Sequence, residues 1–218
     1  MSTSMAEFLE KVSASLGHKE VPASVPEPPE LPDPIVRLVH VEIGLPELFK
    51  AAAEAAKLKV ARVSADSVGA DLVAYLQSLN VKKVGLTNSP LLEKLRVCEI
   101  LREAGFDAKT WDEITLDESY DLDAGVTDVY AAISETGSLV IRPSAQHGRA
   151  LSLVPPLHVA IVEPKNYLPD LVDLFEKLKS EGSPNVTLIT GPSKTADIEG
   201  SLVVGVHGPG VVKVFQLA

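Results

Sequence analysis

The chain has 218 residues, of which 45% are hydrophobic and 23% charged, which is enough apolar material for one substantial core and excludes a disordered chain. A formal net charge of −10 argues against a nucleic-acid-binding protein, because binding to phosphates needs a positive surface. The single cysteine, Cys98, excludes an internal disulfide and cannot supply the thiolates that hold most iron–sulfur clusters. Its spacing from Leu91, Leu95 and Leu101 favours a buried structural thiol over a nucleophile.

A short amphipathic helix is predicted at the start of the chain, within residues 1–20. Apolar side chains recur at helical spacing from Met5 to Leu16, and a glycine then supplies a stop signal. Residues 21–36 are rich in proline, which suits neither a helix nor a central strand, so they are expected to form an extended tether. Residues 37–218 are expected to form one α/β domain. The helix can pack on that domain or on a partner protein.

Neither a secretion signal nor a membrane span is predicted. Glu7 and Glu10 interrupt the first apolar residues, and no later stretch reaches the roughly 18 uncharged apolar residues that a span needs. The cytoplasm is therefore the expected location. The histidines show neither HxH nor HExxH spacing, so no metal site is predicted.

Helices and strands alternate in the first half of the domain. Helices are predicted over residues 45–57, 66–79 and 89–105, and strands over 60–63 and 81–87. The short connections between them predict a mostly parallel, Rossmann-like sheet with helices on both faces. Neither GxGxxG nor GxxxxGK[ST] occurs, so no nucleotide-binding fingerprint is found.

The second half is richer in β-prone runs. Residues 129–134 and 138–141 are predicted to pair as a hairpin or to form a sharp kink. A helix is predicted over 169–180. Further strands are predicted over residues 157–162, 186–190, 202–206 and 211–215.

Three polar clusters lie at the ends of predicted strands, where open α/β sheets form ligand crevices. The first is the turn of Glu135, Thr136, Gly137 and Ser138. Glu135 is the candidate general base or nucleophile of the chain. The alternative is a hairpin with a solvated glutamate.

The second cluster is the loop from Arg142 to Arg149, which concentrates positive charge in an acidic protein. Arg149 can clamp a carboxylate or phosphate with its two parallel donors. The alternative is a structural arginine that satisfies loop carbonyls. His147 stands alone in the loop, and such a histidine is more often merely exposed.

The third cluster spans residues 190–209, where two Gly-Pro turns flank an apolar run expected to be a buried strand. Before that run, residues 193–198 are predicted to form one capped helical turn with free amides at its start. If the turns meet Arg149 at one sheet edge, they form a pocket for a small carboxylate or phosphate; otherwise they are capped surface turns. The candidate residues of this cluster are Ser193, Lys194, Thr195, Ala196, Asp197, His207 and Gly208.

At these residues the chain resembles the LUD-domain family, the family of lactate utilization protein C. The resemblance rests on four motifs spread over both halves of the domain and the N-terminus. They are ISETGSLVI from Ile133, GRALSLVPPLHVAIV from Gly148, ITGPSKTADIEGSLVVGVHGP from Ile189, and FLEKVSASLG from Phe8.

The resemblance implies a NagB/RpiA/CoA-transferase-like fold, similar to that of sugar-phosphate isomerases and CoA transferases. It also implies a cytoplasmic, non-redox subunit of a system that oxidises L-lactate to pyruvate. The iron–sulfur clusters of that system would lie on partner subunits, as the single cysteine requires, so no cofactor is expected in this chain. The alternative is a stand-alone enzyme, similar to a sugar-phosphate isomerase or CoA transferase, that uses Glu135.

Overall fold

The computed structural model describes residues 4–17, 37, 39, 44–182, 185–198 and 201–218. The chain divides into two compact units, Met1–Val36 and Arg37–Ala218. The proline-rich tether predicted over residues 21–36 lies outside the described residues. No helix within the described ranges is long and apolar enough to cross a bilayer.

The first unit contains the predicted N-terminal helix, α1 (Met5–Ser15). Ser4 and Glu7 form a capping box: the Ser4 hydroxyl accepts from the Glu7 amide at 3.2 Å, and the Ser4 amide donates to the Glu7 carboxylate at 2.9 Å. The apolar side chains of α1 are exposed, with Met5 at 73% and Phe8 at 56%.

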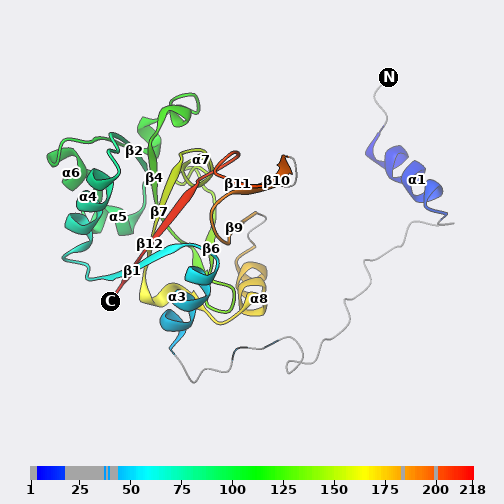
Figure 1. The fold of residues 1–218 in the computed structure, drawn as a ribbon. Helices are drawn as coiled ribbons and strands as arrows, with labels where there is room; N and C mark the ends of the chain where they lie inside the picture. Colours follow the sequence, from blue (N-terminus) through cyan, green and yellow to red (C-terminus); the bar gives the residue numbers. More distant parts are fainter. Residues whose placement is uncertain (1–3, 18–36, 38, 40–43, 183–184, 199–200) are drawn as a thin grey trace. The chain divides into compact units, whose positions relative to one another are not determined.

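The second unit is built on a parallel six-stranded sheet, which confirms the predicted fold class (Figure 1). The strands lie in the order β1-β12-β7-β4-β2-β3, and every neighbouring pair is parallel. Their bounds are β1 (Lys59–Val63), β2 (Lys83–Leu86), β3 (Asp107–Thr110), β4 (Ala124–Asp128), β7 (Leu157–Val162) and β12 (Val211–Leu217).

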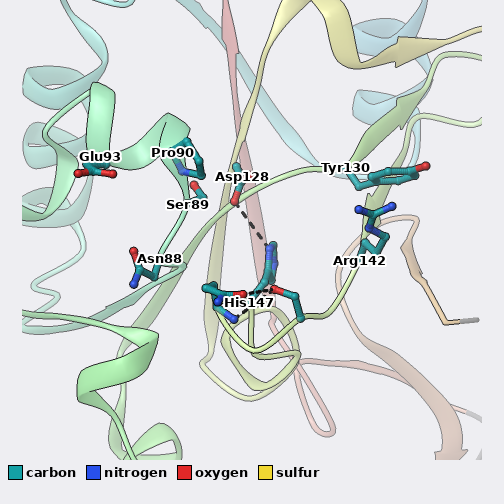
Figure 2. A pocket seen from close by; sticks show the side chains of 10 residues that line it. Asn88, Ser89, Pro90, Glu93, Asp128, Tyr130, Arg142 and His147 are labelled. Atoms are coloured by element: carbon teal, nitrogen blue, oxygen red, sulfur yellow. Dashed lines mark hydrogen bonds and ion pairs between the residues drawn. The ribbon is translucent and has the colours of Figure 1, made fainter. Parts of the chain in front are cut away.

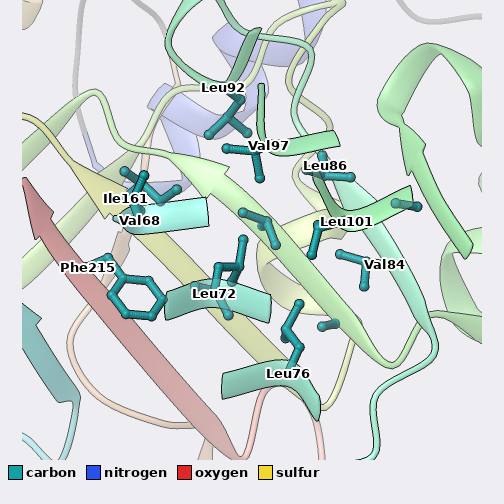
Figure 3. Packing of buried hydrophobic residues seen from close by; sticks show 14 of the residues in the cluster. Val68, Leu72, Leu76, Val84, Leu86, Leu92, Val97, Leu101, Ile161 and Phe215 are labelled. Atoms are coloured by element: carbon teal, nitrogen blue, oxygen red, sulfur yellow. The ribbon is translucent and has the colours of Figure 1, made fainter. Parts of the chain in front are cut away.

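Three helices cover one face of this sheet: α4 (Val68–Ser78), α5 (Pro90–Lys94) and α6 (Val97–Glu103). Their apolar side chains pack on those of the strands, as Leu72 and Phe215 do in Figure 3. The single helix predicted over residues 89–105 is therefore wrong: the chain breaks at Arg96, which has a φ of 53° between α5 and α6. A left-handed residue interrupts the helical hydrogen-bond pattern.

The other face carries α3 (Leu45–Ala55) and a second sheet. This sheet has the order β8-β5-β6-β9, and β5 and β6 are antiparallel, which confirms the predicted hairpin. Leu139 and Ile141 face the main sheet, whereas Val140 faces α8 (Leu171–Glu181). The strands are β5 (Ala131–Ile133), β6 (Ser138–Ile141), β8 (Tyr167–Leu168) and β9 (Thr187–Ile189).

The one-turn helix α7 (Ala150–Leu153) lies across β4. Gly125 of β4 allows this close approach, because a Cβ there would lie 1.8 Å from the Leu151 carbonyl oxygen.

The segment after β9 differs from its prediction. Residues 194–198 form a strand, β10 (Lys194–Ile198), and not a helical turn, and it pairs antiparallel with β11 (Ser201–Val204). The expected buried strand is therefore part of a separate two-stranded hairpin, with Val204 51% exposed and Val206 44% exposed. In the main sheet β12 lies beside β7, and among the described residues β11 pairs with β10.

Two strands of the main sheet, β3 and β4, were not predicted from the sequence. Their sequences, DAKT and AGVTD, contain Asp, Ala and Gly, which are poor strand formers. Burial between layers overrides that preference, since Ala124 to Thr127 are all buried.

Candidate functional site

A cleft of about 500 Å³ opens at the carboxyl ends of β2 and β4. The chain leaves β2 toward β3 at one edge of the sheet, whereas β4 leads toward β7 on the other side. Such a switch in direction between neighbouring parallel strands is where open α/β sheets bind ligands. The lining residues are Asn88, Ser89, Pro90, Glu93, Asp128, Tyr130, Arg142, Ser144, Gln146 and His147.

Asp128 lies between the two walls of the cleft (Figure 2). It is the last residue of β4, and its side chain is 26% exposed. Oδ1 accepts a hydrogen bond of 3.0 Å from the hydroxyl of buried Thr87, and His147 Nδ1 lies 3.7 Å from the same oxygen. The carboxylate is therefore held in one orientation while part of it faces the cleft.

His147 is only 12% exposed, so the expectation of an exposed loop histidine is wrong. A tight turn holds its loop, because Ser144 and His147 exchange backbone hydrogen bonds of 3.1 and 3.2 Å. The Asn88 amide also donates to the Gln146 carbonyl at 3.1 Å, which ties the loop to the end of β2. Burial lowers the pKa of His147, and the nearby Asp128 carboxylate opposes that shift.

A second histidine, His158 of β7, is fully buried. Its Nε2 lies 2.9 Å from the Thr127 hydroxyl. Burial lowers the pKa of His158 to about 3, and His147 adds to that shift. His158 is therefore neutral at physiological pH.

Tyr130 and Arg142 form the opposite wall of the cleft from Asn88 and Glu93 (Figure 2). The Arg142 guanidinium lies 4.6 Å from the centre of the Tyr130 ring. Arg142 and Lys177 both pair with the Glu181 carboxylate. Arg142 is the arginine or lysine among the residues that line the cleft, whereas Lys177 and Glu181 lie behind it.

The cleft thus combines two carboxylates, the fixed one of Asp128 and the exposed one of Glu93, with a guanidinium and several amides and hydroxyls. A carboxylate accepts hydrogen bonds from hydroxyl groups, and a guanidinium binds carboxylates or phosphates. The set suits a small ligand that carries both a hydroxyl and an acidic group. Within the described ranges, no group of three or more His, Cys, Asp or Glu side chains is arranged to hold a metal.

Cys98 lies near the cleft but does not line it; it lines a smaller neighbouring cavity of about 180 Å³. Its thiol is half-buried, and burial raises its pKa, which disfavours the nucleophilic thiolate. This setting matches the structural role predicted for the residue.

The turn of Glu135 to Ser138 lies at the other end of the β5–β6 hairpin from Tyr130 and Arg142. A Cβ at Gly137 would lie 2.2 Å from the Ala53 amide nitrogen, so the turn packs tightly on α3. The hydroxyls form a chain, with Thr136 Oγ1 2.7 Å from Ser138 Oγ, which is 2.6 Å from Thr190 Oγ1. Glu135 is half-exposed beside this chain.

Ser193 and Gly208 do lie side by side, because a Cβ at Gly208 would be 3.2 Å from Ser193 Cβ. They lie, however, at the amino edge of the main sheet, where Pro209 leads into β12. Backbone hydrogen bonds already occupy amides there: Ser193 donates to Pro209, and Gly205 donates to Ser193. The expectation of free amides at a helix start is therefore wrong for these groups.

Arg149 is exposed and caps the amino end of α7. The other end of α7 approaches Gly208, since the Leu153 carbonyl lies 3.4 Å from a Cβ built there. One helical turn thus separates Arg149 from the Leu153 carbonyl that approaches Gly208. Lys194 and His207 are exposed and Thr195 is half-buried; the side chains of Ala196 and Asp197 are outside the described set.

The predicted residues therefore do not gather in the cleft. Ligand binding stays a prediction for three separate places: the turn of Glu135, the Ser193–Gly208 contact and Arg149. In the loop that the sequence analysis singled out, Arg142 and His147 line the cleft, and Arg149 does not. Asn88, Glu93, Asp128 and Tyr130 were missed, because their signal is the order of the strands, which the sequence analysis could not provide.

The chain is similar in sequence to a known domain family and to individual proteins. Residues 46–215 match the model of the LUD domain. The chain is 30% identical to lactate utilization protein C of Exiguobacterium sp., over 95% of this chain and 93% of that protein. It is 32% identical to the uncharacterized protein YkgG of Escherichia coli (strain K12), over 63% of each chain, so it spans less than two thirds of that relative's length.

A solved structure shares the fold. It is the crystal structure of a DUF162 family protein from Deinococcus radiodurans, which matches with a TM-score of 0.62 at 24% identity. The match covers 80% of this chain and 96% of that one.

Proposed function

Because the chain belongs to the LUD-domain family, we propose that it is a non-redox subunit of a cytoplasmic system that oxidises L-lactate to pyruvate. The observation that carries this proposal is the similarity to a lactate utilization protein C along nearly the whole of both chains. Separate iron–sulfur proteins are its proposed partners, since one cysteine cannot hold such a cluster.

We place the ligand, a small carboxylate such as lactate, in the cleft between β2 and β4. The Arg142 guanidinium, which also pairs with Glu181, offers N–H donors to the ligand carboxylate, and Asp128 and Asn88 supply polar groups for a hydroxyl. A phosphate would use the same guanidinium, so inorganic phosphate is the appropriate competitor in a binding assay.

The partner proposal is tested by purification of the tagged chain from cells grown on lactate. We expect iron–sulfur proteins to copurify and the purified chain alone not to oxidise lactate. Hydride transfer needs an acceptor, and no nucleotide fingerprint occurs in the sequence. Lactate oxidation by the isolated chain without added cofactor would overturn the proposal.

The alternative is a stand-alone enzyme, similar to a sugar-phosphate isomerase or CoA transferase, that uses Glu135. It is favoured by the fixed backbone of the turn that carries Glu135, because the Glu135 amide donates to the Pro169 carbonyl at 3.0 Å and Gly137 packs on α3. Glu135→Gln separates the two functions, with Glu103→Gln, at an exposed side chain of α6, as the matched control. Loss of isotope exchange or of a covalent CoA adduct in Glu135→Gln alone would favour the enzyme. Unchanged growth on lactate would speak against a catalytic glutamate.

A further inference from the structure

We propose that Asp128 makes the cleft selective for 2-hydroxy acids over the corresponding 2-oxo acids. The inference rests on the proposed function, because it concerns the ligand of the same cleft. It assigns discrimination between lactate and pyruvate to one side chain and carboxylate binding to another.

The first argument is the position of the Asp128 carboxylate. It lies at the carboxyl end of β4, at the point where the connections of the sheet change direction, and it lines the cleft. Among the described residues, Thr87 and His147 both contact Oδ1, at 3.0 and 3.7 Å. Oδ2 is therefore the oxygen available to a ligand.

The second argument is the hydrogen-bonding capacity of the two kinds of acid. An ionised carboxylate only accepts hydrogen bonds, so it can bind the hydroxyl of a 2-hydroxy acid. The keto oxygen of a 2-oxo acid also only accepts, and it would face Asp128 with no proton between two oxygens. A site built to bond one polar group rejects an analogue that lacks it, because buried polar atoms are left unpaired.

The third argument is that Arg142 cannot make this distinction. Its guanidinium, which also pairs with Glu181, offers N–H donors to any ligand carboxylate. Lactate and pyruvate carry the same carboxylate group. Selectivity must therefore come from a group that faces the adjacent carbon. Of the two carboxylates that line the cleft, Asp128 is held by Thr87, whereas Glu93 is exposed.

Thr87 is a positioning residue for Asp128. Its side chain is 1% exposed, and its hydroxyl donates to Oδ1 while the Asp128 amide approaches the same hydroxyl at 3.4 Å. These contacts fix the carboxylate rotamer, which a directional hydrogen bond to a ligand requires.

The test is calorimetric titration of the full chain with L-lactate and with pyruvate. We expect the wild type to prefer lactate by about tenfold or more, which corresponds to one charge-assisted hydrogen bond. In Asp128→Asn the amide can donate to a keto oxygen, so the preference falls to about one or reverses. Asp66→Asn is the matched control, because Asp66 is exposed and follows β1, which lies three strands from β4. We expect this variant to keep the wild-type preference for lactate.

Thr87→Val provides a second variant that keeps the side-chain volume and removes only the hydroxyl. It is expected to lower the preference for lactate by a few fold. This variant tests the same inference if Asp128→Asn does not fold. A wild type that binds both acids equally, or a preference unchanged in either folded variant, overturns this inference and leaves the proposed function intact. A wild type that binds neither acid overturns both the proposed ligand and the inference.

Discussion

The carboxyl ends and the amino ends of the strands of the main sheet differ in how their polar groups are used. At the carboxyl edge, Asp128, His147 and Arg142 surround an open cleft. At the amino edge, the turns around Ser193 and Gly208 bond to each other through their backbones. Polar residues in Gly- and Pro-rich turns therefore bond to each other at the amino ends of the strands, whereas side chains at the carboxyl ends of β2 and β4 line a cleft.

The difference teaches that a polar turn is not by itself a binding site. Ser193 and Gly208 were expected to direct free amides at an anion, yet the Ser193 amide donates to Pro209 at 2.9 Å. A buried or turn amide that finds a backbone partner loses its capacity for a ligand.

The largest expected effect is on the free energy of unfolding, at the contact between α7 and Gly125 of β4. Gly125→Ala would place a Cβ 1.8 Å from the Leu151 carbonyl oxygen, so α7 must move away from β4. We expect the free energy of unfolding to fall by about 3 kcal/mol in denaturant titrations. Gly208→Ala is the matched control at the amino edge, where the nearest atoms lie at 3.2 and 3.4 Å. A loss in the control as large as in Gly125→Ala would show that the close approach of α7 is not what limits stability.

An intermediate effect is expected from pH. The pKa of His158 falls from 6.5 to about 3 in the folded chain, so the unfolded chain takes up the proton first as the pH falls. Its contribution to stability is complete above about pH 6.5 and is lost between pH 6.5 and about 3.

His158→Gln removes this titration and keeps a polar group for the Thr127 hydroxyl. Between pH 7 and pH 5 the wild type should lose about 2 kcal/mol more unfolding free energy than the variant. Equal losses in both proteins, measured in parallel denaturant titrations, would contradict the neutral buried histidine.

The smallest effect separates the two arginines of one loop. Arg142→Ala removes the guanidinium from the cleft wall and should weaken lactate binding about tenfold. Arg149→Ala should leave the dissociation constant unchanged, because Arg149 lies at the start of α7 and does not line the cleft. Calorimetry on both variants checks the difference, and the reverse order of effects would return the ligand to the residues predicted from the sequence.

Much of the fold could be predicted because the periodicity of apolar residues reports local structure. The helix α3, the hairpin of β5 and β6, and β7 all have clear patterns and match their expected ranges. The strands β3 and β4 could not be predicted, since their Asp, Ala and Gly residues are poor strand formers that pairing with β2 holds in the sheet.

The cleft was harder to predict for a different physical reason. It depends on which strands are neighbours, and β2 and β4 become neighbours only because the chain passes through β3 at the edge first. Asp128 is then an aspartate at the end of an unrecognised strand, and Asn88 follows a strand whose neighbours the sequence does not identify. The loop from Arg142 to Arg149 was found by its charge alone, which does not distinguish its cleft-lining arginine from its exposed one.

The place of β12 has a consequence for the order of events during synthesis. This strand comes last among those of the main sheet, yet it inserts between β1 and β7. Until residues 211–217 have left the ribosome, β1 has no neighbour in the sheet and β7 presents an open parallel edge. A nonsense codon shortly before Val211 would therefore leave β1 without a partner in the sheet and leave the edge of β7 open to pairing with other chains.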